Sequence, residues 1–143
     1  MLKPFDLWDF VRESNRIEGI ERTTEEQVEA HCLFLSRPAT VDSLVDLVAV
    51  LQPDARLRNS AGIPGVRVGN HIAPLSGPEI QANLNSILAI PDPWEQHIVY
   101  ETLHPFTDGN GRSGRALWLH RFNGEALLGF LHSFYYQTLA GVR

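Results

Sequence analysis

The chain has 143 residues, 43% hydrophobic and 20% charged, which is the size and composition of one folded domain and not of a disordered segment. Twelve basic residues against seventeen acidic ones leave a net charge of −5, which argues against binding to nucleic acid or to a membrane surface. The single cysteine, Cys32, excludes an internal disulfide and a cysteine-based metal cluster. Because no long apolar run or signal peptide is present either, we expect one cytoplasmic domain over residues 1–143.

Two helices are predicted in the first quarter of the chain. An amphipathic helix up to about Ile17 is indicated by apolar residues at helical spacing: Phe5, Trp8 and Val11. Thr24 followed by Gln27 matches a capping box, in which each side chain bonds the backbone of the other residue. A second helix is therefore expected from Thr24 to about Ser36.

The next apolar segment starts at Thr40 or Asp42 and ends before Pro53, which predicts a third helix. The stretch 58–74 differs, because glycine and proline alternate there with β-branched residues. We interpret it as a small β-hairpin or loop, with Gly69-Asn70 at the tip.

Capping signals recur in the second half of the chain. Ser76 and Asp92 each precede proline and glutamate, so both are predicted N-caps, the second for a helix reaching about Leu103. Two further helices are predicted over residues 112–122 and 125–139. The expected fold class is therefore all-α with one short β excursion.

One stretch, residues 104–115 (HPFTDGNGRSGR), has features suited to binding phosphate. Gly109-Asn110-Gly111 allows backbone conformations in which successive N–H groups converge on an anion. A helix that begins there adds its positive N-terminal end. Arg112 and Arg115 lie three residues apart, so both can reach the same anionic ligand.

The same stretch also offers a metal ligand and a base. Asp108 is a hard oxygen ligand suited to Mg²⁺ that bridges phosphates. His104 follows a predicted helix and has the residue type of a general base near neutral pH. Together these groups favour a phosphate-transfer site.

The sequence offers two other candidate metal sites. A calcium loop starting at Asp108 fails, because Ser113 stands where glycine is needed and Leu119 where a bidentate acid is needed. A zinc site remains open, because three potential ligands share one helical face: His97, Glu101 and His104.

Residues 104–115 fit the signature H-x-F-x-(D/E)-G-N-G-R-x-x-R throughout, and the chain thereby resembles the Fic family. Residues 65–74 (GVRVGNHIAP) resemble the flap of that family, a β-hairpin that holds the target protein by strand addition. The flap residues expected to contact the target are Val66, Arg67, Val68, His71 and Ile72. Ser14 to Gly19 (SNRIEG) resembles the inhibitory motif (S/T)-x-x-x-E-(G/N) of the self-inhibited class.

The resemblance implies a Fic fold, a helical bundle with the flap beside the active-site loop, and an adenylyltransferase that moves AMP from ATP to a Ser, Thr or Tyr hydroxyl of another protein. His104 would act as the base and Asp108 would hold Mg²⁺. The phosphates would be bound by Gly109, Asn110, Gly111, Arg112 and Arg115. Phe106 would anchor the loop in the core.

The resemblance also implies self-inhibition. Glu18 would pair with Arg115 in the place of the γ-phosphate, Ser14 would hydrogen-bond locally to fix the helix, and Gly19 would end the helix.

Other functions on the same fold stay open. Relatives that transfer the γ-phosphate carry lysine where this chain has Gly111, which favours nucleotidyl transfer here. Transfer of UMP or another phosphate group, removal of AMP with Glu18 orienting a water, and a catalytically silent nucleotide-binding module are the alternatives. A separate antitoxin partner and a homo-oligomer are also compatible with the sequence.

Overall fold

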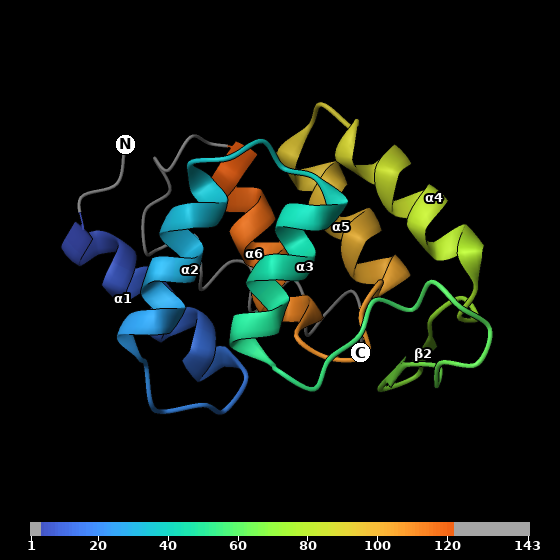
Figure 1. The fold of residues 1–143 in the computed structure, drawn as a ribbon, viewed down its shortest axis with the longest axis horizontal. Helices are drawn as coiled ribbons and strands as arrows, with labels where there is room; N and C mark the ends of the chain where they lie inside the picture. The colour runs from blue at the N-terminus through green and yellow to red at the C-terminus, as the bar shows by residue number, and fades with distance from the viewer. Residues whose placement is uncertain (1–3, 122–143) are drawn as a thin grey trace.

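The computed structural model describes residues 4–121, which form six helices and one two-stranded antiparallel sheet (Figure 1). The helices are α1 (Pro4–Ile17), α2 (Glu25–Leu35), α3 (Val41–Leu51), α4 (Pro78–Leu88), α5 (Pro93–Leu103) and α6 (Asn110–Arg121). The strands are β1 (Arg67–Val68) and β2 (His71–Ile72). The predicted helical class with a short hairpin is confirmed for these residues, and the helix predicted at 125–139 lies outside them.

Local capping explains where most helices begin. Thr24 and Thr40 each form a complete capping box, and the carboxylate of Asp92 accepts a hydrogen bond from the backbone of Glu95. The prediction for Ser76 is wrong, because α4 is preceded by Gly77 and has no side-chain cap. The Ser76 hydroxyl instead lies against Arg58 and the Pro64 carbonyl.

Helix α1 is amphipathic as predicted, but Trp8, which was predicted on its apolar face, lies at the surface. Trp8 is 38% exposed, while Leu7, Phe10 and Val11 are buried against the end of α6. The same face continues into buried polar residues one turn later, beginning at Ser14. The helix ends at Ile17, and Gly19 follows two residues later with a φ of +77°, in the left-handed region that favours glycine.

Helix α6 is the central element, since it packs against α1, α2, α3 and α5. Its C-terminal half contributes apolar side chains to the two core clusters, among them Leu117, Trp118 and Leu119. Its N-terminal half is also buried but polar. Buried polar groups require partners, so this half of α6 must meet other polar side chains.

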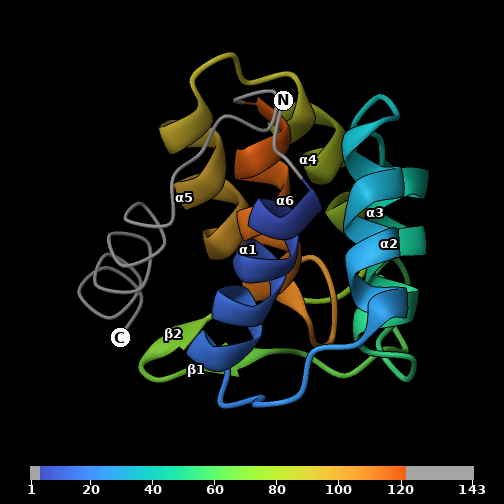
Figure 2. The same cartoon turned by 90° about the vertical axis from the view of Figure 1, so that its left-hand side faces the viewer.

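One end of the helical bundle gathers the elements that form the site. The end of α1 and the hairpin lie at the lower end in both views, and the loop that leads from α5 into α6 reaches down toward them (Figures 1 and 2). In the hairpin Arg67 pairs with Ile72 and Val68 with His71, so Gly69-Asn70 forms the predicted tip. No helix within residues 4–121 has the length and apolarity needed to cross a membrane.

Candidate active site

His104 caps the C-terminal end of α5 in an unusual conformation. Its φ of +48° makes it the non-glycine residue with a left-handed backbone among those described, and only 6% of it is exposed. Its Nδ1 lies against the Glu101 carbonyl oxygen. A carbonyl only accepts hydrogen bonds, so Nδ1 carries the proton and Nε2 keeps its lone pair. Burial lowers the pKa of His104, which keeps the ring neutral at pH 7.

The loop after His104 is held from inside. Phe106 is buried, as predicted, and pairs with Leu57 in an isolated antiparallel bridge. The Asn110 side chain braces this loop, because its Oδ1 accepts from Phe106 N (2.9 Å) and its Nδ2 donates to Phe106 O (2.8 Å). Gly109 has a φ of +80°, and its N–H donates to Asp108 Oδ1 (2.8 Å). The expected glycine conformation is therefore present, with this N–H turned to a carboxylate.

Both arginines of α6 are buried and make hydrogen bonds to distant parts of the chain. Arg112, 3% exposed, donates to Asn15 Oδ1 (3.2 Å) and to Gln52 Oε1 (3.0 Å). Arg115, 2% exposed, donates from Nε to the Ser14 hydroxyl and from Nη2 to the Ser14 carbonyl. The sequence predicted only a local hydrogen bond for Ser14 and missed this contact.

Glu18 lies one turn beyond Ser14 and forms the predicted pair with Arg115. The distance between Glu18 Oε2 and Arg115 Nη2 is 2.8 Å, and the Glu18 side chain is 37% exposed. The end of α1 thus contacts both arginines of α6, through Ser14 and Asn15 of the helix and through Glu18 just after it.

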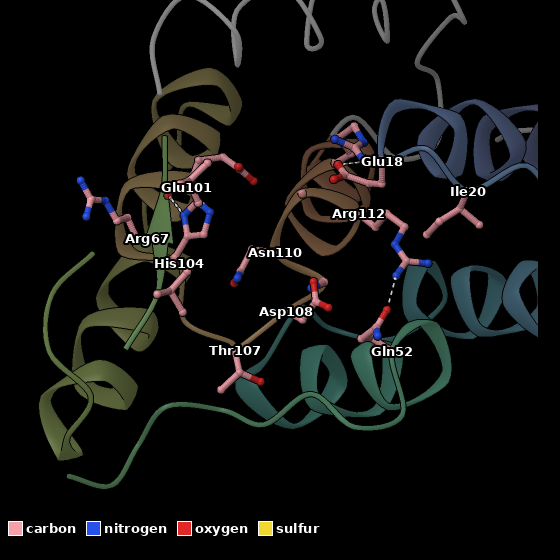
Figure 3. A pocket seen from close by; sticks show the side chains of 15 residues that line it. Glu18, Ile20, Gln52, Arg67, Glu101, His104, Thr107, Asp108, Asn110 and Arg112 are labelled. Atoms are coloured by element: carbon pink, nitrogen blue, oxygen red, sulfur yellow. Dashed lines mark hydrogen bonds and ion pairs between the residues drawn. The ribbon is translucent and has the colours of Figure 1, made fainter. Parts of the chain in front are cut away.

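A pocket of about 380 Å³ lies between α1, the loop before α6 and the hairpin (Figure 3). Its volume falls within the range of about 300–1,000 Å³ typical of small-molecule sites. The predicted site residues that line it are Glu18, Val66, Arg67, Val68, His104, Asp108, Gly109, Asn110, Gly111, Arg112 and Arg115. Ser14, Gly19, His71 and Ile72 do not line it. Lining residues that the sequence did not single out for this site are Ile20, Gln52, Glu101 and Thr107.

The hairpin is anchored beside the site by His71. Its Nε2 donates to the Thr102 carbonyl (2.8 Å), and its ring centroid is 6.1 Å from that of His104. Ile72 is 68% exposed. Because β1 and β2 pair only with each other among the described residues, each leaves backbone groups that an extended peptide can bond.

The zinc alternative is not supported. His97 lies between α5 and α6 with its Nδ1 3.4 Å from the Gly114 carbonyl. Within residues 4–121 no group of three or more His, Cys, Asp and Glu side chains is placed to hold a metal ion.

Glu101 is a buried carboxyl in the pocket wall. Its Oε1 has no hydrogen-bond partner among the described residues, and it fits against α6 because Gly114 has no side chain. Burial raises the pKa of Glu101 to about 8, with Arg115 opposing the rise and Glu18 adding to it.

Glu101 should make the protein less stable as the pH rises from 6.5 to 8. The folded state retains a proton that the unfolded state has already released, so the free energy of unfolding falls with pH by about 1 kcal/mol per pH unit. The buried His31 and His97 have pKa values lowered from 6.5 to about 4. They make the free energy of unfolding rise with pH, but only below pH 6.5, outside this range.

Urea unfolding of the wild type and Glu101→Gln across this pH range tests the expectation. The substitution should flatten the dependence, whereas Glu95→Gln, on an exposed position of the same helix, should leave it intact. A slope that survives in Glu101→Gln would assign the dependence to another group.

Gly111 provides the space that Glu18 occupies. A Cβ on Gly111 would collide with Glu18 Oε2, so Gly111→Ala should push the carboxylate away from Arg115. Alanine favours a helix over glycine by about 1 kcal/mol, so α6 itself should not weaken. We expect faster hydrogen exchange of backbone amides near the end of α1. The control is Gly62→Ala, where a Cβ meets nothing within 4 Å, and its exchange rates should equal those of the wild type. Unchanged exchange in Gly111→Ala would contradict this.

A scan against protein-family models and searches of curated proteins and of solved structures found nothing that matches this chain.

Proposed function

We propose that this chain has the Fic fold and is a self-inhibited protein adenylyltransferase, which moves AMP from ATP to a hydroxyl side chain of a target protein. The observation that carries the proposal is the match of residues 104–115 to the family signature. The pocket supports it, because His104, Asp108, Arg112 and Arg115 all line the same cavity.

In the proposed reaction the target hydroxyl oxygen attacks the α-phosphorus of ATP. The bond to the oxygen between the α- and β-phosphorus atoms breaks, and pyrophosphate leaves. His104 Nε2 carries the lone pair of the neutral ring, and this nitrogen would take the proton of the hydroxyl group. Arg112 and Arg115 would stabilise negative charge on the leaving phosphates.

The residues present fit a bound magnesium ion. Asp108 is an exposed carboxylate on the pocket wall, and one carboxylate together with phosphate oxygens and waters is a common ligand set for Mg²⁺. The ion would neutralise charge between the phosphates. The target segment would lie along the flap, with its backbone paired to an open strand edge.

The position of Glu18 supports self-inhibition. Its carboxylate contacts Arg115 inside the pocket, so a phosphate group that needs Arg115 must displace it. An anion in this place also repels the phosphates of a bound nucleotide.

The test uses purified Glu18→Gly protein with Mg²⁺, a cell extract and ATP labelled at either the α- or the γ-phosphate. Label on protein from α-labelled ATP alone, lost in the Glu18→Gly/His104→Ala double variant, is the expected result. Label from γ-labelled ATP alone would replace the proposal with a kinase. No label from either would direct attention to another nucleotide, to AMP removal or to a silent nucleotide-binding module.

A further inference from the structure

Arg58 is a fully buried cation outside the pocket. It follows α3 in the segment leading to the hairpin, and its relative exposure is 0%. A buried guanidinium is costly unless its donors are paired, so its partners indicate what it stabilises.

Two of its partners are the last carbonyls of α5. Arg58 Nε donates to His104 O (2.7 Å), and Nη2 donates to Leu103 O (2.8 Å). Terminal helix carbonyls lack partners within the helix and form the negative end of its dipole, which a cation stabilises.

The third nitrogen bonds the segment after the flap hairpin. Arg58 Nη1 donates to Pro74 O (2.7 Å) and to the Ser76 hydroxyl (3.2 Å). The Arg58 backbone adds a bond to each side, since its N–H donates to Pro105 O (2.9 Å) and its carbonyl accepts from Gly77 N (3.0 Å). One residue therefore joins the end of α5, the loop after His104 and the segment that follows the hairpin.

His104 needs such support, because its left-handed backbone is unfavourable for a residue with a side chain. Its own carbonyl is bonded by Arg58 Nε, and the same backbone conformation directs the imidazole to the pocket. Loss of that bond would leave the His104 carbonyl buried and free to reorient.

We infer that Arg58 is a positioning residue for His104 in the proposed transfer reaction: its planar fork holds His104 in its left-handed conformation and ties the base of the flap to it. This role rests on the proposed function, although the geometry it explains does not. The charge of Arg58 also contributes to the lowered pKa of His104, after the larger effects of burial and of His71, while the Glu101 carbonyl and Glu18 act in the opposite direction.

Arg58→Lys is the informative substitution. Lysine keeps the positive charge but lacks the planar guanidinium, whose three nitrogens bond different carbonyls at the same time. Arg56→Lys is the matched control, two residues away and exposed. Both are made in the Glu18→Gly background. Urea unfolding establishes that each is folded, nuclear magnetic resonance follows the titration of the His104 ring, and α-labelled ATP with a cell extract measures transfer.

We expect Arg58→Lys to shift the titration of His104 and to lower transfer about 10- to 100-fold, as small misplacements of catalytic groups do, with Arg56→Lys unchanged in both. A folded Arg58→Lys protein with parental titration and transfer would overturn the inference and leave Arg58 a purely stabilising residue. If the Glu18→Gly parent transfers no label, the proposed function fails, and the titration of His104 still decides the role of Arg58.

Ser76→Ala provides a second route should Arg58→Lys not fold. It removes one acceptor of Nη1 and keeps the bonds to Leu103 and His104. Faster hydrogen exchange in residues 71–77 is the expected result, because Arg58 ties the base of the flap to the end of α5. Unchanged exchange in these residues would overturn the inference.

Discussion

His104→Ala is expected to reduce AMP transfer about 10²- to 10⁴-fold in the Glu18→Gly background, the usual contribution of a positioned general base. The ring is suited to that role, because its Nδ1 proton is held by the Glu101 carbonyl and Nε2 remains available. Binding of ATP should be largely retained, since within residues 4–121 Arg112 and Arg115 form their hydrogen bonds with residues other than His104. Transfer rates with α-labelled ATP and nucleotide binding by calorimetry measure the two effects separately.

The pH dependence of transfer gives a second view of the same residue. A general base must be neutral to accept a proton, so transfer should fall as the pH falls through the pKa of His104. Burial lowers that pKa below 6.5, and loss of Glu18, which raises it, should lower it further. The acid limb in Glu18→Gly should therefore have its midpoint below 6.5. A midpoint above 7, or a His104→Ala protein with parental rates, would remove His104 from the role of base.

Glu18→Gly is expected to raise AMP transfer about 10-fold over the wild type. A hydrogen bond to a charged group contributes about 1.5–3 kcal/mol, and partial exposure of Glu18 places the effect near the lower end. Two hydrogen bonds from Arg115 to Ser14 remain in the variant, so α1 should stay in place.

The comparison for Glu18→Gly is Glu21→Gly, an exposed position in the loop after α1 that gains the same backbone freedom. Only the change at residue 18 should raise transfer and tighten ATP binding. If both variants behave alike, loosening of the loop explains the gain; if transfer stays at the wild-type rate, self-inhibition by Glu18 is wrong.

Much of the secondary structure could be predicted because its signals are local. The capping boxes at Thr24 and Thr40 need only residues three apart, and the tip at Gly69-Asn70 needs only its own backbone freedom. Ser76 shows the limit of such signals. Its hydroxyl has the sequence context of an N-cap, yet Arg58, eighteen residues earlier, takes it as a partner.

The candidate site also has one part that local sequence predicts and one part that it does not. Its residues 104–115 are contiguous, so the sequence by itself was enough to predict His104, Asp108, the glycines and the two arginines as one candidate site. The pairing of Glu18 with Arg115 was expected only through the family resemblance, because the two residues are 97 positions apart.

Only the tertiary structure decided how this unit is supported. The contacts of Arg112 with Asn15 and Gln52, of Arg115 with Ser14 and of Arg58 with His104 join segments from 46 to 101 positions apart. Such contacts cannot be predicted from local sequence, because each depends on how whole helices pack around α6. Burial of polar groups at the start of α6 then makes these partners necessary, since an unpaired buried arginine would destabilise the fold.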